Sequence, residues 1–247
     1  MPYIALSNCC PPNVVRTIAE VSDYAYSVSD KGLWFNLYGG NNLTTKLTDG
    51  SKVSLTEETN YPWDGKIKIS MKETGNKAYS VFLRIPVWTH DAKITINGKL
   101  ENIKVISGTY AEINRVWKKG DVVELNLPMN ATLIEANPLV EENRNQIAVK
   151  RGPVVYCLES TDLPGKSIFN AFIPTSTKFE AKPMTIDGAE VMSLVGDAKI
   201  VEPNNWKNIL YRPIDNKNTT TQIKLVPYFA WGNRGHSEMS VWLPVSR

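Results

Sequence analysis

The chain has 247 residues, of which 42% are hydrophobic and 21% charged, and its 28 basic and 25 acidic side chains leave a formal net charge of +3. This composition excludes an intrinsically disordered chain, and without a run of five like charges it offers no electrostatic footprint for nucleic acid or an anionic membrane surface. No apolar stretch approaches about 18 residues, and the first residues carry neither a basic segment nor a long apolar one, so no membrane span or signal peptide is visible.

The first chemical feature is an adjacent cysteine pair, Cys9 and Cys10, far from the third cysteine, Cys157. Adjacent cysteines rarely bridge to each other, and these positions do not make a disulfide framework. Two neighbouring thiolates can reach one zinc ion, but tetrahedral zinc needs further ligands. Neither His90 nor His236 has a second His or Cys at ligand spacing, so we expect both histidines to be surface or hydrogen-bonded turn residues.

The segment after the cysteines is the one stretch with helical periodicity. Its apolar residues recur at helical spacing: Val14, Ile18, Val21 and Ala25. Pro11 and Pro12 suit a first helical turn, where an N–H has no intrahelical partner, and we predict that the helix ends at residues 29–32. Cys9 and Cys10 then precede a helix N-terminus, which favours a thiolate over a thiol. The alternative is that they are two small buried residues in the turn before a helix.

From Leu33 onward the apolar period changes to two, and Asn97-Gly98 is a strong hairpin signal. Strands are predicted at 66–71, 79–85, 94–96, 110–113, 122–127, 146–150, 154–158, 223–226 and 239–243. Many short strands without intervening helices are typical of antiparallel sandwiches.

The chain therefore has a mainly β fold, with one helix followed by two antiparallel β-sandwich domains. A boundary near Leu127 to Asn130 gives three parts: a helical segment at 1–31, a first sandwich at 32–129 and a second at 130–247. A single helix cannot bury its own apolar face. We expect it to pack on the sandwiches, on a second chain or on a further domain.

Aromatic residues in turns suggest sugar recognition. Trp63, Trp88 and Trp231 stand beside Asp, Asn or Arg in turn-rich sequences, and a ring face stacks on a sugar while polar neighbours bind its hydroxyls. Core or corner packing is the more frequent role of such residues in sandwiches. Paired carboxylates for glycoside hydrolysis cannot be assigned from their spacing.

The order of the motifs resembles the C-terminal part of glycoside hydrolase family 127, the β-L-arabinofuranosidase-like enzymes. The motifs are Cys9-Cys10-Pro11-Pro12-Asn13, Asn36-Leu37-Tyr38, Tyr61-Pro62-Trp63-Asp64-Gly65, Arg84-Ile85-Pro86-Val87-Trp88, Asn97-Gly98, Trp117-Lys118-Lys119-Gly120-Asp121, Leu127-Pro128-Met129, the run from Arg151 to Glu159 and the run from Ala230 to Gly235.

The resemblance implies a helical (α/α) barrel that carries the active site and precedes the two sandwiches. It implies retaining exo-glycosidase activity on arabinose-containing glycans, with a zinc-bound cysteine as nucleophile. By position, Cys9 matches the nucleophile and a zinc ligand, and Cys10 matches the neighbouring zinc ligand. A zinc-bound thiolate stays deprotonated at neutral pH and can attack an anomeric carbon.

The resemblance also places the remaining zinc ligands and the acid/base glutamate on the barrel, upstream of Cys9. We therefore expect that residues 1–31 hold the last helix of a missing barrel, that the true N-terminus is missing too, and that this chain alone is inactive and binds zinc weakly or not at all. The partners expected are the barrel, an arabinose-containing oligosaccharide and, as a possibility, a second copy in a homodimer. The alternative is a non-catalytic carbohydrate-binding or structural module.

Overall fold

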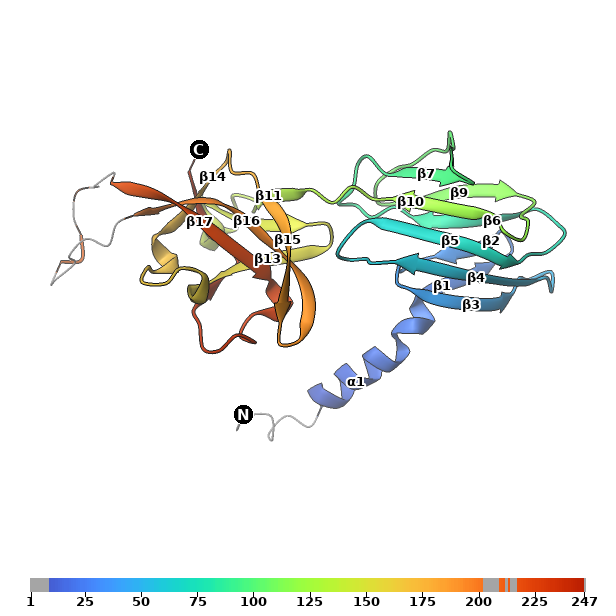
Figure 1. The fold of residues 1–247 in the computed structure, drawn as a ribbon, viewed down its shortest axis with the longest axis horizontal. Helices are drawn as coiled ribbons and strands as arrows, with labels where there is room; N and C mark the ends of the chain where they lie inside the picture. The colour runs from blue at the N-terminus through green and yellow to red at the C-terminus, as the bar shows by residue number, and fades with distance from the viewer. Residues whose placement is uncertain (1–8, 202–208, 212, 214–216, 247) are drawn as a thin grey trace. The chain divides into compact units, whose positions relative to one another are not determined.

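Strands dominate the computed structural model, which describes residues 9–201, 209–211, 213 and 217–246 (Figure 1). The chain divides into two units, Met1–Pro128 and Met129–Arg247, called here the N-terminal and C-terminal units. One α-helix, α1 (Cys10–Glu20), precedes the strands, so the predicted mainly β fold with a single helix is confirmed. Within the described residues, no helix has the length and apolar character that a membrane crossing requires.

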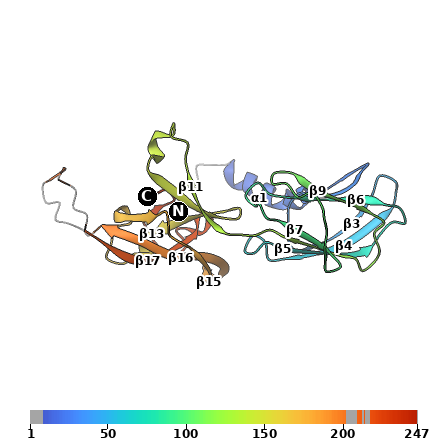
Figure 2. The same ribbon diagram turned by 90° about the horizontal axis from the view of Figure 1, so that it is seen from above.

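Two sheets make up the N-terminal unit. One has four strands in the order β1 (Tyr26–Ser29), β2 (Gly32–Phe35), β6 (Tyr79–Arg84) and β9 (Tyr110–Arg115), and its β2–β6 pair is parallel. The other has six, in the order β3 (Asn41–Lys46), β4 (Lys52–Thr59), β5 (Lys66–Glu73), β10 (Val122–Asn126), β7 (Lys93–Ile96) and β8 (Lys99–Leu100). Figure 2 separates β6 and β9 from β4 and β5, as expected of two packed layers.

The core of this unit lies between the two sheets. Along β5, buried Ile67, Ile69 and Met71 alternate with residues that face away from the core. They share one apolar cluster with residues of the other sheet, such as Leu33 and Leu83. Burial of one face of each sheet is the main stabilising contribution to such a sandwich.

The C-terminal unit is one nine-stranded sheet rather than two separate ones. Its order is β11 (Ala131–Glu135), β12 (Gln146–Arg151), β19 (Leu243–Ser246), β14 (Ala171–Pro174), β16 (Ala189–Val201), β17 (Asn218–Pro227), β13 (Val154–Glu159) and β18 (Met239–Ser240), and β15 (Glu180–Ile186) pairs with β16. Because β12 pairs with β13 as well as with β19, the pairings return to their starting strand and the sheet closes on itself. Short 3-10 helices lie in the loops between these strands: η3 (Glu141–Asn143), η4 (Ser160–Asp162), η5 (Ile168–Asn170) and η6 (Tyr228–Ala230).

Two predicted elements are wrong in their extent. The helix does not reach residues 29–32: it ends at Glu20, a 3-10 turn η2 (Val21–Tyr24) follows, and Tyr26 already begins β1. The Tyr26 ring packs edge-on against Phe35 and its hydroxyl donates to Glu57, contacts that draw this segment into the sheet. The predicted strand at 239–243 is interrupted because the Ser240 hydroxyl donates to the carbonyl of Trp242 and closes a turn.

A glycine in the N-terminal unit marks a close approach of two backbone segments. A Cβ atom at Gly65 would lie 1.8 Å from the carbonyl oxygen of Leu127, whose own N–H donates to the Gly65 carbonyl at 2.8 Å. A Cβ atom at Gly39, in the same unit, would meet no other atom within 4 Å, and this glycine needs no special backbone angle.

We predict that Gly65→Ala lowers the free energy of unfolding by about 1–3 kcal/mol or more, because the backbone of 65 and 127 must separate. Gly39→Ala is the matched control and is expected to be neutral or slightly stabilising. Urea unfolding followed by circular dichroism measures both. Equal stability of the two variants would contradict the close approach.

Candidate functional site

The cysteine pair stands at the beginning of α1. Cys9 occupies the N-cap position and Cys10 is the first helical residue. Both side chains are exposed, and their sulfur atoms are 3.7 Å apart. Cys9 makes no side-chain capping bond to the helix. Within the described chain, the two cysteines are therefore not buried by the turn before the helix.

The helix itself offers few donors to a thiolate. Pro11 and Pro12 carry no N–H, and the N–H of Asn13 donates to the carbonyl of Cys9 at 3.2 Å. The first turn has no basic side chain, so neither amide groups nor a cation of this turn stabilise negative charge strongly. The expected benefit of a helix N-terminus is therefore small here, and thiolate chemistry at Cys9 requires another source of positive charge.

Two adjacent thiolates suit zinc, but the described residues place no further ligand beside them. Among the described residues, no three His, Cys, Asp or Glu side chains come together as metal ligands. Tetrahedral zinc requires four ligands, or three and a water. The donor set of Cys9 and Cys10 thus fits zinc in chemistry and falls short of it in number.

The apolar face of α1 has no partner within the described chain. None of the helix residues is buried, and Val14, Val15 and Ile18 are each more than half exposed. An amphipathic helix normally buries such a stripe against another element. Among the described residues, no packing of this stripe fixes the position of the cysteines.

The third cysteine has the opposite surroundings. Cys157 lies on β13 with no exposed surface, and burial raises the pKa of its thiol to about 12. A thiol of this kind is unreactive at neutral pH. The three cysteines therefore differ in their surroundings: Cys9 and Cys10 are exposed, whereas Cys157 is buried.

The aromatic and histidine candidates are dispersed. Trp63 and Trp88 are half-buried in the N-terminal unit, where Trp88 packs against the core, whereas Trp231 belongs to the C-terminal unit and is partly exposed. The three rings are thus divided between two units, and neither unit contains all of them. His90 and His236 are both exposed, as the sequence predicted.

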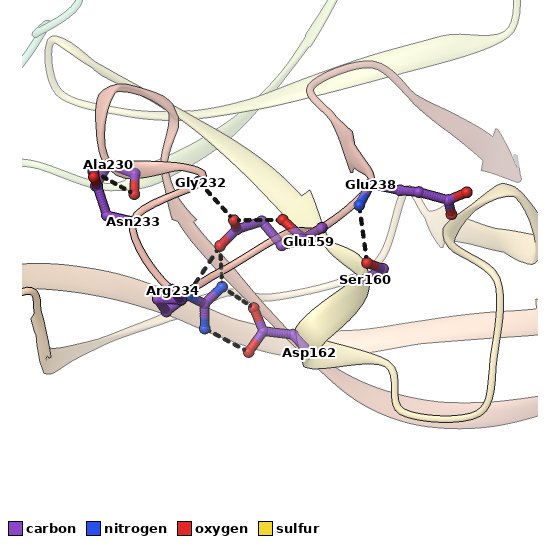
Figure 3. A network of polar contacts seen from close by, with 9 residues as sticks. Glu159, Ser160, Asp162, Ala230, Gly232, Asn233, Arg234 and Glu238 are labelled. Atoms are coloured by element: carbon purple, nitrogen blue, oxygen red, sulfur yellow. Dashed lines mark hydrogen bonds and ion pairs between the residues drawn. The ribbon is translucent and has the colours of Figure 1, made fainter. Parts of the chain in front are cut away.

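A buried charge network, not recognised from the sequence, organises the C-terminal unit (Figure 3). Glu159 ends β13 with no exposed surface and accepts hydrogen bonds from the N–H of Gly232 at 3.0 Å, from the hydroxyl of Ser237 at 3.0 Å and from the guanidinium of Arg234. The same guanidinium donates to both oxygens of Asp162 on η4. One carboxylate therefore holds three points of the loop from 232 to 237.

These carboxylates are not suited to glycoside hydrolysis. Burial alone raises the pKa of Glu159, but the hydrogen bonds from Gly232, Arg234 and Ser237 and the charge of Arg234 outweigh it and hold the pKa below its ordinary value. A general acid needs a raised pKa and access to the substrate. Glu57 does have a pKa raised by burial, but it is enclosed by the sandwich and bonded to Tyr26 and Gly39.

Family profiles match both units. The profile described as "Beta-L-arabinofuranosidase, GH127 middle domain" matches residues 32–129, and that of the "Glycoside hydrolase family 127 C-terminal domain" matches residues 131–244. A curated relative is the "Non-reducing end beta-L-arabinofuranosidase" of Bifidobacterium longum subsp. longum. It is 28% identical over 248 residues, which cover 95% of this chain and 36% of the relative.

Solved structures agree. A protein described as "Glycoside hydrolase" is 46% identical with a TM-score of 0.94 and covers 98% of this chain. A GH127 beta-L-arabinofuranosidase from Geobacillus stearothermophilus T6 is 39% identical with a TM-score of 0.90 and covers 96%. The present chain spans 40% and 37% of these two proteins, so it corresponds to little more than a third of its relatives' length.

We predict that Glu159→Gln destabilises the C-terminal unit by about 3 kcal/mol, because it leaves the partly buried Arg234 with one charged partner fewer and removes the charge that the loop donors bind. The control is Glu190→Gln on β16, an exposed site expected to change stability little. Folding lowers the pKa of Glu159, so its carboxylate stabilises the folded state. This contribution to the free energy of unfolding is complete above the pKa of the unfolded state and is lost as the pH falls through the pKa of the folded state. Urea unfolding at neutral and acidic pH tests this: the variant should lose less stability on acidification than the parent, and an equal loss would contradict the network.

Proposed function

Because the chain belongs to glycoside hydrolase family 127, of which it carries the middle and C-terminal domains, we propose that it is the C-terminal part of a retaining β-L-arabinofuranosidase that acts on arabinose-containing glycans. Two of the relatives are named β-L-arabinofuranosidases, which supports the sugar and its anomeric form. The observation that carries the proposal is the exposed pair Cys9 and Cys10 at the start of a helix whose apolar face has no partner in the described chain.

Cys9 has the role of nucleophile in this proposal. Its sulfur attacks the anomeric carbon, the glycosidic C–O bond breaks, and the leaving oxygen takes a proton from an acid outside the described residues. Water then displaces the sulfur from the same carbon. Two displacements at one carbon restore its original configuration, which is the origin of retention.

Cys10 has the role of zinc ligand, together with Cys9. Bound zinc would supply the positive charge that the first turn of α1 lacks. It would hold the Cys9 sulfur in its deprotonated form. The sulfur atoms are 3.7 Å apart, close to the separation of two thiolates that bind a single tetrahedral zinc. The other ligands must come from a part of the enzyme outside this chain.

The partner of α1 in this proposal is a helical barrel that contains those ligands and the acid/base group. Val14, Val15 and Ile18 present an apolar stripe that a neighbouring helix would bury. Packing of this stripe would place Cys9 and Cys10 at the barrel. Without it the cysteines have no fixed position, so the 247-residue chain alone is inactive.

We expect no Cys9-dependent hydrolysis of an aryl β-L-arabinofuranoside by the 247-residue chain. Joining the barrel region of a GH127 relative in front of Cys9 should restore hydrolysis, and Cys9→Ala in that joined protein should reduce kcat by at least about a thousandfold, since the nucleophile is lost. Release of the aryl alcohol is followed by absorbance.

Cys157→Ala is the matched control, because this thiol is buried in the C-terminal unit and takes no part in the reaction. It should leave kcat unchanged. Turnover by the chain alone that disappears in Cys9→Ala, or full activity of the joined Cys9→Ala protein, would refute the proposal.

A further inference from the structure

A groove in the C-terminal unit brings together side chains from segments far apart in the sequence. It encloses about 430 Å³, within the range of small-molecule sites of about 300–1,000 Å³. Its residues come from the η3 to β12 region, from η5, from η6 and from the link between β18 and β19. The rings of Phe169, Tyr228 and Trp242 line it, together with the amides of Asn143 and Gln146.

The chemistry of the lining favours a neutral, polar ligand. None of the described residues that line the groove is charged. The aromatic rings offer apolar faces, while the amides, the Tyr228 hydroxyl and backbone groups offer donors and acceptors. An anionic or cationic ligand would be desolvated there without a counter-charge, which disfavours its binding. Rings beside amides match a sugar, which has apolar C–H faces and hydroxyls at its edges.

Two of the rings remain solvent-exposed. Phe169 is 73% exposed and Tyr228 47%, so neither is explained by packing in the core of the unit. The turn that carries Phe169 is fixed, because the hydroxyl of Ser167 accepts a hydrogen bond from the Phe169 N–H at 3.2 Å. Exposed aromatic residues on capped turns are a recurrent device of ligand recognition.

The other walls of the groove are also held in place. Tyr228 directly follows β17 and precedes the loop that Glu159 clamps through Gly232, Arg234 and Ser237. The turn before Trp242 is closed by the Ser240 hydroxyl. The groove is thus formed before a ligand arrives, which lowers the entropy cost of binding.

We propose that this groove is a glycan-binding site for short neutral oligosaccharides of arabinose, separate in its residues from the cysteine pair. Its assignment to arabinose rests on the proposed function, whereas its preference for a neutral saccharide rests on the lining alone. The site holds a glycan by ring stacking and amide hydrogen bonds and performs no chemistry on it.

Isothermal titration calorimetry of the 247-residue chain with short linear arabino-oligosaccharides tests the proposal. We expect millimolar or tighter binding, weakened about five- to tenfold by Phe169→Ala and by Tyr228→Ala and largely retained by Tyr228→Phe, which keeps the ring. Because the described lining carries no charge, affinity should not change between low and high salt. Quenching of tryptophan fluorescence should disappear in Trp242→Phe.

Phe229→Ala is the matched control: it removes a neighbouring exposed aromatic ring that does not line the groove, and it should bind as the parent does. Absence of binding at millimolar sugar overturns the glycan site. Equal binding of cello-oligosaccharides overturns its assignment to arabinose. Light scattering that reveals a dimer abolished by Phe169→Ala identifies the groove as a contact between copies and also overturns it.

Cys9→Ala separates this proposal from the catalytic one. It should leave binding to the groove unchanged, because Cys9 does not line it. Failure of sugar binding would leave the Cys9-dependent hydrolysis of the joined protein as it is, and failure of hydrolysis would leave the binding measurement intact.

Discussion

The arrangement of the C-terminal unit depends on the burial of one carboxylate, Glu159, against one guanidinium, Arg234, from a loop 75 residues further along the chain. Removing a carboxylate from water is costly, and the cost is offset because both oxygens of Glu159 accept hydrogen bonds, from Gly232, Ser237 and Arg234. The network therefore demands one conformation of the loop. The hydrogen bonds and the charge of Arg234 hold the pKa of Glu159 below its ordinary value, and the side chain has no exposed surface.

No comparable restraint acts on the helix that carries the cysteines. The N-terminal unit encloses a continuous core between two sheets, yet α1 contributes no buried residue to it. An isolated helix of fewer than about 12–15 residues is marginal in water. The chain belongs to glycoside hydrolase family 127 and covers little more than a third of its relatives' length. The exposed apolar face of α1 agrees with such partial coverage. The β units have buried cores of their own, while no described residue buries the apolar side chains of the helix that carries Cys9 and Cys10.

Much of this could be predicted from the sequence where local pattern decides the structure. The alternation of Ile67, Ile69 and Met71 predicts β5, and Asn97-Gly98, both at positive φ, predicts the β7–β8 turn. The strand Tyr26–Ser29 was not predicted, because it depends on contacts of Tyr26 with Phe35 and Glu57 that no local sequence pattern contains. The charge network could not be predicted for the same reason, since Glu159 and Arg234 meet only because β13 pairs with β17 and β18, the strands on either side of the loop. Phe169 was not singled out, because nothing in its neighbourhood predicts that its ring stays exposed.

The central claim is that the apolar face of the cysteine-bearing helix, with Val14, Val15 and Ile18, is not buried by the described part of this chain. Hydrogen–deuterium exchange of the 247-residue protein, resolved to peptides by mass spectrometry, measures it most directly. The account predicts that amides of α1 from Asn13 to Glu20 exchange nearly as fast as in an unstructured peptide, while those of β5 and β16 remain protected. Protection of α1 comparable to that of the strands, whether from its own units or from a second copy, would contradict the claim.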